Sequence, residues 1–292
     1  MKFKIGYASD FHMDFYIDSK YSGDSLDKRV VFYVEKYLLP EDCDVMILSG
    51  DLSHYTKQIF SLITYLKQYA NSIIVLDGNH EKYLVSKSQM KQYNKNSFRK
   101  INEIKEWCLE EEDVYFLDGN IIELWGLRIG GTCNWYDLPT QAHLEQWNQV
   151  LNDSNYIIED KEPITIKYAY SYSEKISQWD TQSYRQSEKN NLIKISNEGV
   201  DIFVTHICPI IIPDQFQNQK YIGDKNNIFY MTDDIDIIKA SNAKICIFGH
   251  QHDVKTFEEE NIEFKINAQG YPKENLDFSG FKFFNYENDY VK

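Results

Sequence analysis

The sequence predicts a layered α/β fold. Short apolar runs rich in β-branched residues alternate with longer stretches of helical periodicity, which is the pattern of sheets covered by helices. The chain has 292 residues, 42% hydrophobic and 15% aromatic, enough for a substantial buried core. No internal repeat, low-complexity tract or flexible linker divides it, so we expect one domain over residues 1–292.

The expected strands are short apolar runs bounded by turn residues. They are Phe3–Ala8, Val45–Ser49, Ile73–Leu76, Leu127–Gly131, Ile202–Thr205, Ile245–Phe248 and Ile262–Ile266. The expected helices lie between them, at Lys28–Leu39, Lys57–Tyr69, Ser97–Glu111 and about Tyr170–Ser196. Residues at about 134–189 are polar, aromatic and weakly periodic, which predicts a loop and helix insertion that either shapes a substrate pocket or only decorates the fold.

The charge balance bears on the partners that the protein can bind. With 31 basic and 45 acidic residues the formal net charge is -14. Affinity for a phosphate backbone comes largely from Lys and Arg, so an acidic surface disfavours nucleic acid without excluding it, because metal ions can reverse the local field.

Five scattered cysteines without a C-x-x-C motif predict buried free thiols rather than a disulfide framework or a zinc finger. The N-terminus becomes polar too early for a signal peptide, and no apolar run approaches the ~20 residues that span a bilayer. We therefore expect a reduced, cytoplasmic protein with no membrane partner.

Five polar segments follow directly on apolar runs. They are Ser9-Asp10-Phe11-His12, Gly50-Asp51-Leu52-Ser53-His54, Gly78-Asn79-His80-Glu81, Thr205-His206-Ile207-Cys208-Pro209 and Gly249-His250-Gln251-His252. In a sheet of mostly parallel strands the carboxyl ends share one edge, so these segments are expected to meet in one crevice. Their Asp, Asn and His side chains form a ligand set suited to Zn, Fe, Mn or Co rather than Ca or Cu(I).

The spacing within the segments supports a common centre. In Asp10-x-His12 and His250-x-His252 one residue separates the polar pair, so on extended backbone both side chains face the same side. Glycine precedes three of the polar groups and lets the chain turn sharply as it leaves a strand. A single Asp-x-His is more often a turn than a ligand pair, but Asn-His or His-x-His directly behind a buried strand has no packing role.

In this order the segments resemble the signature of the calcineurin-like metallophosphoesterase superfamily: D-x-H, G-D, G-N-H-[DE], H and G-H-x-H. The match runs from residue 10 to residue 252 and no ligand position is missing. The resemblance implies a four-layer αββα sandwich of two mixed β-sheets flanked by helices, with a binuclear metal site at the carboxyl ends of the strands. It also implies two metal ions, Mn, Fe or Zn, and a bridging hydroxide that attacks a phosphate ester.

The resemblance further implies the role of each site residue. One metal would take Asp10, His12, Asp51 and His252, and the other would take Asp51, Asn79, His206 and His250. Asp51 would bridge the two metals, since a carboxylate has two oxygens. His80 matches a histidine beside the site that stabilises the transition state or protonates the leaving oxygen; the alternative is a group that only orients a ligand.

Several nearby residues keep more than one interpretation. His54 lies in a Gly-Asp-x-x-His setting similar to that of the double-strand-break repair nucleases of the superfamily, although a surface or loop histidine is favoured. Asp77 stands where the family usually has a small residue or proline, and either adds negative charge or caps a turn. Cys208 either lines the crevice or is an inert buried thiol, the favoured role. His143 is expected to be exposed and unrelated to chemistry.

Two short stretches resemble an uncharacterised bacterial branch of the superfamily. They are Gly131-Thr-Cys-Asn-Trp135, followed by Asn152-Asp153, and residues 267–274, which read Asn-Ala-Gln-Gly-Tyr-Pro-Lys-Glu. These stretches suggest that Trp135 and the insertion roof the pocket, whereas core packing of Trp135 is the alternative.

The favoured function is hydrolysis of a small phosphomonoester or phosphodiester, such as a nucleotide or cyclic nucleotide. The chain has only four arginines, the residue best suited to bidentate phosphate capture, which argues against a broad nucleic-acid groove. A nuclease is the alternative enzyme, supported by His54 and by the aromatic insertion. A metal-binding scaffold for partner proteins is the third interpretation, although such relatives usually lack ligands. The sequence does not decide the oligomeric state.

Overall fold

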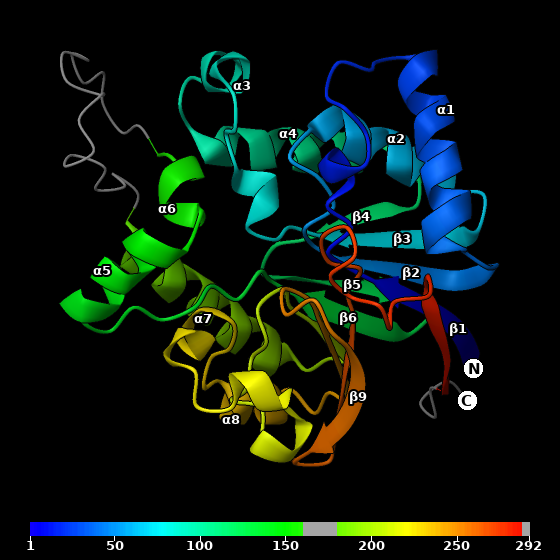
Figure 1. Ribbon diagram of the computed structural model, residues 1–292. Coiled ribbons are helices and arrows are strands. Elements are labelled where there is room, and N and C mark those ends of the chain that lie inside the picture. Colours follow the sequence, from blue (N-terminus) through cyan, green and yellow to red (C-terminus); the bar gives the residue numbers. More distant parts are fainter. Residues whose placement is uncertain (160–179, 288–292) are drawn as a thin grey trace.

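The computed structural model describes residues 1–159 and 180–287, and two β-sheets form its centre (Figure 1). One sheet has five strands in the order β11-β1-β2-β3-β4, and the other has six in the order β5-β6-β7-β8-β10-β9. The strands are β1 Lys2–Ala8, β2 Cys43–Ser49, β3 Ala70–Leu76, β4 Val114–Leu117, β5 Asn120–Leu124, β6 Leu127–Gly131, β7 Ile202–Val204, β8 Ile245–Phe248, β9 Val254–Glu259, β10 Ile262–Asn267 and β11 Lys282–Glu287.

Both sheets are mixed. In the first sheet β1, β2, β3 and β4 run parallel and β11 pairs antiparallel with β1. In the second sheet β6, β7, β8 and β10 run parallel, while β5 and β9 are antiparallel edge strands. The parallel strands at the centre of each sheet bring their carboxyl ends to a common edge, as the polar segments require.

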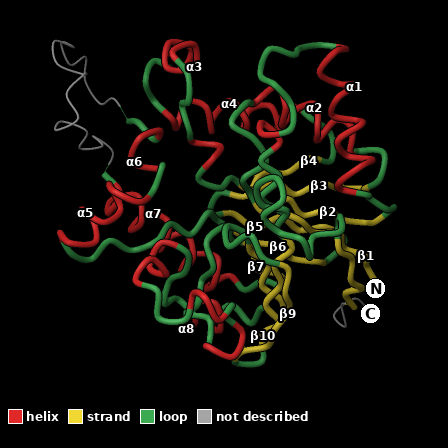
Figure 2. The backbone as a smooth tube through the Cα atoms, viewed as in Figure 1, coloured by secondary structure: helices red, strands yellow, loops and turns green. Residues whose placement is uncertain are grey.

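Helices cover the outer face of each sheet (Figures 1 and 2). The α-helices are α1 Asp24–Tyr33, α2 Thr56–Leu66, α3 Lys87–Gln92, α4 Ser97–Glu110, α5 Gln141–Val150, α6 Asp153–Tyr156, α7 Thr181–Glu198 and α8 Ile235–Ala240. Shorter helical turns are η1 Met13–Phe15, η2 Val34–Leu38, η3 His80–Lys82, η4 Asp214–Phe216, η5 Gln219–Tyr221 and η6 Lys225–Phe229. Helices α1, α2 and α4 pack on the five-stranded sheet, and α7 and α8 pack on the six-stranded sheet.

The packing explains why the central strands read as continuous apolar runs. In β2, Val45 and Ile47 point into the layer between the sheets, whereas Met46 and Leu48 point toward the helices. Successive side chains of a strand face opposite sides, so a strand buried on both faces has no polar alternation. The predicted α/β sandwich of two mixed sheets flanked by helices is therefore confirmed.

The element boundaries differ from the expected ones in several places. The first helix begins at Asp24 and continues into the π-helical turn η2, whereas the sequence predicted Lys28–Leu39. Helix α7 ends at Glu198, and residues 170–179 of the helix expected at about Tyr170–Ser196 lie outside the described residues. Strands β4, β5, β9 and β11 were not expected.

Helix length and composition bear on membrane insertion. Among residues 1–159 and 180–287, no helix is both long enough and apolar enough to cross a bilayer.

Candidate metal centre

The polar residues that follow the strands converge at one edge of the two sheets. Asp10, Asp51 and Asn79 follow β1, β2 and β3, and His206 and His250 follow β7 and β8. All of them are buried, with at most 8% of each residue exposed. The two halves of the site therefore come from the two sheets, which face each other across their shared apolar layer.

The backbone of these segments is unusual. Five of the predicted ligands adopt the left-handed conformation, with φ of 55° at Asp10, 43° at His12, 57° at Asp51, 67° at His250 and 46° at His252. This conformation costs a non-glycine residue about 1–2 kcal/mol. Such strain persists only where the surrounding structure imposes it, and it collects at functional sites.

The glycines before the polar residues leave space for neighbouring side chains of the site, and one of them also forms a sharp turn. Gly50 has φ +91°, which supports the expected sharp turn, but Gly78 and Gly249 do not have positive φ. A Cβ at Gly78 would lie 2.1 Å from Asp51 Oδ1 and 2.7 Å from His206 Nε2, and a Cβ at Gly249 would lie 2.8 Å from Asp10 Oδ2. Any side chain at these two positions would collide with the site.

The first group of side chains comprises Asp10, His12 and His252, whose ligand atoms lie within 4.8 Å of one another. His252 Nε2 lies 3.5 Å from Asp10 Oδ1 and 2.9 Å from His12 Nε2. Two bare imidazole nitrogens at this separation repel each other, so a proton or another cation must lie close to both.

The second group comprises Asp51, His206 and His250, again within 4.8 Å of one another. Asp51 Oδ2 lies 3.4 Å from His206 Nε2, and His206 Nε2 lies 3.2 Å from Asn79 Oδ1. Asp51 Oδ2 also lies 4.0 Å from His12 Nε2, so this carboxylate stands between the two groups.

Three of the proposed histidine ligands have partners for the nitrogen that faces away from the centre, whereas within the described part of the chain His12 Nδ1 has none. His206 Nδ1 bonds the Ser49 carbonyl at 2.8 Å, and His250 Nε2 bonds the Phe229 carbonyl at 3.1 Å. His252 Nδ1 lies 2.6 Å from Glu274 Oε2. Such contacts set the tautomer and orientation of a metal-binding histidine.

Buried carboxylates fix the loops that carry the site. Glu81 accepts backbone N–H groups from Asp51 at 2.9 Å, Leu52 at 2.6 Å and Gly78 at 2.7 Å, so it ties the two loops together. Asp153, at the start of α6, accepts the Asn79 amide N–H at 2.9 Å and turns the amide oxygen toward His206.

Burial and charge act in opposite directions on the histidines. Burial lowers the pKa of His12 to about 4 and that of His250 to about 3. Burial also lowers the pKa of His206, but the Asp51 carboxylate outweighs it and the pKa rises to about 9. For His252, hydrogen bonds to Asp10 and Glu274 outweigh burial and raise the pKa to about 10.

His80 forms a third such group with His12 and Asp51, again with ligand atoms within 4.8 Å of one another, and it ends a chain of side chains. Its Nε2 is 3.9 Å from Asp51 Oδ2 and faces the centre, while its Nδ1 is 2.7 Å from His54 Nε2. His54 Nδ1 in turn lies 2.8 Å from Asp14 Oδ2. His54 lies in a loop, which is one part of the favoured interpretation, but its side chain is only 12% exposed and contacts His80, so it is not an exposed surface residue.

Tyr271 packs against the histidines of the centre. Its hydroxyl is 3.2 Å from His80 Nε2, and its ring centroid lies 4.5 Å from that of His12 and 5.0 Å from that of Phe15. Tyr271 and Glu274 both come from the 267–274 stretch singled out in the sequence, although neither role could be assigned there. Asp14 was missed, and its only signal is its position two residues after His12.

Three other interpretations are resolved by packing. Trp135 is fully buried against Tyr136 and Tyr184, so it belongs to the core and does not roof the site. Cys208 is also fully buried and burial raises the pKa of its thiol to about 12, as expected for an inert thiol. Asp77 forms a buried ion pair with Lys82, which compensates its charge.

The insertion itself contributes through its helices. Glu188 of α7 accepts the Thr132 hydroxyl and the Asn134 N–H, both at 2.7 Å, and so anchors the segment after β6. His143 lies on α5, where its Nδ1 is 2.9 Å from the Thr140 hydroxyl, and takes no part in the centre.

The donor set is one that a metal ion would accept. Carboxylate oxygens, an amide oxygen and imidazole nitrogens converge from two sides, while outer partners orient the rings. This mixed N and O set fits Zn, Fe or Mn and contains no thiolate.

Comparison with known protein families gives a match over most of the chain. Residues 3–254 match the sequence model of the calcineurin-like phosphoesterase family. No curated protein sequence matched the chain.

Three solved structures align with nearly the whole chain, and one of them resembles the fold closely enough to support it. The phosphopantetheinyl hydrolase from Mycobacterium tuberculosis is 16% identical with a TM-score of 0.68, covering 96% of this chain and 95% of that one. The protein TT1561 of Thermus thermophilus is 10% identical with a TM-score of 0.48, at 98% and 99% coverage. A dimetal phosphatase from Danio rerio is 11% identical with a TM-score of 0.41, at 97% and 91% coverage.

Proposed function

Because the chain belongs to the calcineurin-like phosphoesterase family, we propose that it hydrolyses a small phosphomonoester or phosphodiester at a two-metal centre. The observation that carries this proposal is the position of Asp51, whose Oδ2 lies 3.4 Å from His206 Nε2 and 4.0 Å from His12 Nε2. One carboxylate thus stands between two imidazole groups, as a bridging ligand must.

The proposed ligands divide into two sets that share Asp51. One metal would be held by Asp10, His12, Asp51 and His252, and the other by Asp51, Asn79, His206 and His250. Metals bound there would supply Lewis-acid stabilisation of the phosphoryl oxygens and would lower the pKa of a water molecule. Manganese, iron and zinc all suit this donor set.

The chain's own residues would orient and protonate the substrate. His80 Nε2 faces the centre beside Asp51, where it can donate a proton or hydrogen bond to the leaving oxygen. Tyr271 shields that nitrogen from water through its hydroxyl, 3.2 Å away. A substrate would have to displace this contact in order to reach His80.

The charge of the chain favours a small substrate. A net charge of -14 opposes the approach of a long polyanion, and Arg128 and Arg185 bond Glu198 and Asp137 rather than facing the centre. The contact of His54 with His80 is the one new observation that suits the nuclease alternative. Five free, buried cysteines support a reducing, cytoplasmic location as part of this proposal.

Metal content and ester hydrolysis, measured together, test the proposal. Purified protein is analysed for metals and assayed on bis-p-nitrophenyl and mono-p-nitrophenyl phosphate, with chelator-stripped and manganese-reloaded protein as controls. We expect about two metals per chain and manganese-dependent turnover. A chain that holds no metal and gains no activity on reloading would refute the two-metal centre. If single-stranded DNA or RNA is hydrolysed with comparable efficiency, the protein is a nuclease rather than a hydrolase of small phosphate esters.

Glu274→Gln tests whether the 267–274 stretch supports the first metal. Glutamine keeps the size of the side chain but loses the negative charge beside His252 Nδ1, 2.6 Å away. Loss of such an outer partner typically lowers metal affinity about 10–100-fold. Competition with a chromogenic chelator measures this affinity, and Glu260→Gln, on an exposed turn, is the control. Equal affinities in the two variants would show that Glu274 does not support the metal.

Metal affinity should depend on pH in a definite direction. In the metal-free protein the pKa values of His206 and His252 are about 9 and about 10, so both carry a proton at neutral pH. A metal requires neutral imidazoles, so binding at neutral pH should release about two protons and should strengthen as the pH rises. Calorimetry in buffers of different ionisation enthalpy counts these protons. The free energy of unfolding of the metal-free protein should change with pH in the opposite direction. The raised pKa values of His206 and His252 stabilise the fold fully below pH 6.5, and this stabilisation is lost as the pH rises through 9 to 10.

A further inference from the structure

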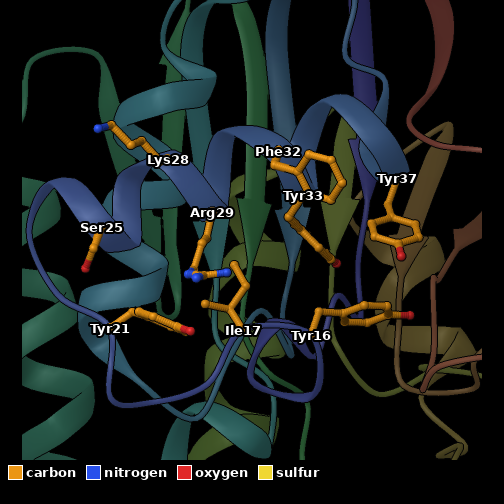
Figure 3. Close-up of a pocket in the computed structure, with 9 residues that line it drawn as sticks. All are labelled: Tyr16, Ile17, Tyr21, Ser25, Lys28, Arg29, Phe32, Tyr33 and Tyr37. Carbon is orange, nitrogen blue, oxygen red and sulfur yellow. The ribbon is translucent and has the colours of Figure 1, made fainter.

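A separate pocket of about 510 Å³ lies between α1, its continuation η2 and the segment at residues 16–21 (Figure 3). None of the proposed metal ligands lines it. Its volume is within the range of about 300–1,000 Å³ typical of sites for small molecules. The pocket therefore raises the question of what ligand its walls would accept.

Tyrosine rings form one wall of the pocket. The ring centroids of Tyr16, Tyr33 and Tyr37 lie 5.1 to 5.4 Å apart, and Figure 3 shows these side chains on the same side of the hollow. Tyr33 is only 1% exposed and its hydroxyl donates to the Phe11 carbonyl at 3.0 Å, which holds the wall in place. Fixed aromatic faces of this kind stack on flat ring systems.

Arg29 lies on the opposite side. Its guanidinium stands 3.7 Å above the ring of Tyr21 and points into the hollow (Figure 3). Among residues 1–159 and 180–287, no carboxylate lies within ion-pair distance of Arg29 or of its neighbour Lys28. The donors of the guanidinium are therefore available to an anion.

Three carboxylates on α1, η2 and the neighbouring loop have hydrogen-bond or ion-pair partners other than Arg29, although Asp18 also feels the charge of Arg29. Asp18 pairs with Lys20 at 3.0 Å, Asp27 accepts the Ser61 hydroxyl, and Glu35 accepts the Tyr65 hydroxyl. In a chain with a net charge of -14, two exposed cationic side chains, Lys28 and Arg29, thus stand beside aromatic faces.

We propose that this pocket binds a flat, anionic ligand of the mononucleotide type. The phosphate would pair with the Arg29 guanidinium, whose planar fork matches phosphate oxygens, and Lys28 would add positive charge at the rim. The ring would lie against Tyr16 and Tyr37. This proposal does not depend on the metal centre or on the reaction proposed for it.

The pocket and the metal loops share a wall. The Gln269 side chain bonds the hydroxyls of Tyr33 and Tyr16, the latter at 3.2 Å, while its backbone N–H donates to the Ser9 carbonyl at 3.0 Å. The Tyr33 hydroxyl also donates a hydrogen bond to the backbone carbonyl of Phe11, which lies between Asp10 and His12 in the chain. A ligand in the pocket would thus rest on residues that also position the site.

Calorimetric titration of the full chain with adenosine 5′-monophosphate tests the proposal. A chelator keeps the metal centre empty, so that phosphate cannot bind there. We expect saturable binding that Arg29→Ala weakens about tenfold, the loss typical of a charged hydrogen bond. Tyr37→Leu should weaken the nucleotide but not inorganic phosphate. The control Lys2→Ala, at the far end of β1, should bind like the unaltered protein.

Three results would overturn the proposal. They are no saturable binding at millimolar nucleotide, an affinity that Arg29→Ala leaves unchanged, and inorganic phosphate binding as tightly as the nucleotide. Arg29 and Lys28 are exposed, so their replacement should not prevent folding. Because the titration measures binding without metal, its failure would leave the proposed hydrolase activity untouched.

Discussion

Replacing Asp51 with asparagine is expected to abolish two-metal occupancy and nearly all turnover. The asparagine amide cannot act as the anionic oxygen that stands between His206 and His12, at 3.4 and 4.0 Å. Metals contribute several kcal/mol of transition-state stabilisation. Because about 1.36 kcal/mol of activation free energy corresponds to a tenfold change in rate, we expect kcat to fall on the order of 10³-fold. Elemental analysis and the rate of bis-p-nitrophenyl phosphate hydrolysis measure the two effects.

The asparagine variant is expected to fold. Its side-chain oxygen can still accept the His80 backbone N–H, which donates to Asp51 Oδ1 at 2.8 Å. Circular dichroism and the melting temperature of the metal-free proteins provide the control. Two metals per chain together with full activity would contradict the bridging role of Asp51.

Replacing His80 with alanine should leave both metals bound and lower kcat by about 10²–10⁴-fold, the usual contribution of general acid catalysis. His80 presents Nε2 to the centre but is not one of the proposed ligands. His143→Ala on α5 is the matched control, since the hydrogen bonds of His143 go to Thr140 in its own helix cap. An unchanged kcat in the His80 variant would make this histidine purely structural.

The neighbours of His80 explain how a buried imidazole can donate. Burial lowers the pKa of His80 well below its usual value, so the ring is neutral at neutral pH. His54 lies between Asp14 Oδ2, 2.8 Å from its Nδ1, and His80 Nδ1, 2.7 Å from its Nε2. Where His80 Nδ1 accepts the hydrogen bond from His54, the proton of the neutral His80 ring is on Nε2, which faces the centre. Asp14→Asn should therefore lower kcat without changing metal content.

Much of the fold was predictable because its central strands are buried on both faces. Runs such as Val45–Ser49 and Ile245–Phe248 have no polar alternation, and their ends are marked by the polar segments. Edge strands lack this signal. In β9 and β11 charged, polar and aromatic residues are mixed, because most of their side chains are only partly buried.

The convergence of the proposed ligands was also predictable, because each follows a strand whose carboxyl end points to the same edge. Their supporting residues were not. Asp14, Asp153 and Glu274 come from a helical turn, a short helix and a turn region, and only the three-dimensional packing brings them to the histidines and to Asn79. Trp135 is the opposite case. Its position near a motif suggested a pocket wall, with core packing as the alternative, and the structure places it in the core.

Strand β11 has a consequence for the solubility of shortened forms of the protein. It covers β1 along the whole register from Lys2↔Glu287 to Tyr7↔Lys282. A chain ending at residue 281 would leave the N–H and C=O groups of β1 open along an apolar strand, and exposed edges of this kind pair with other chains. Such a shortened protein should self-associate and precipitate even though every proposed ligand is present.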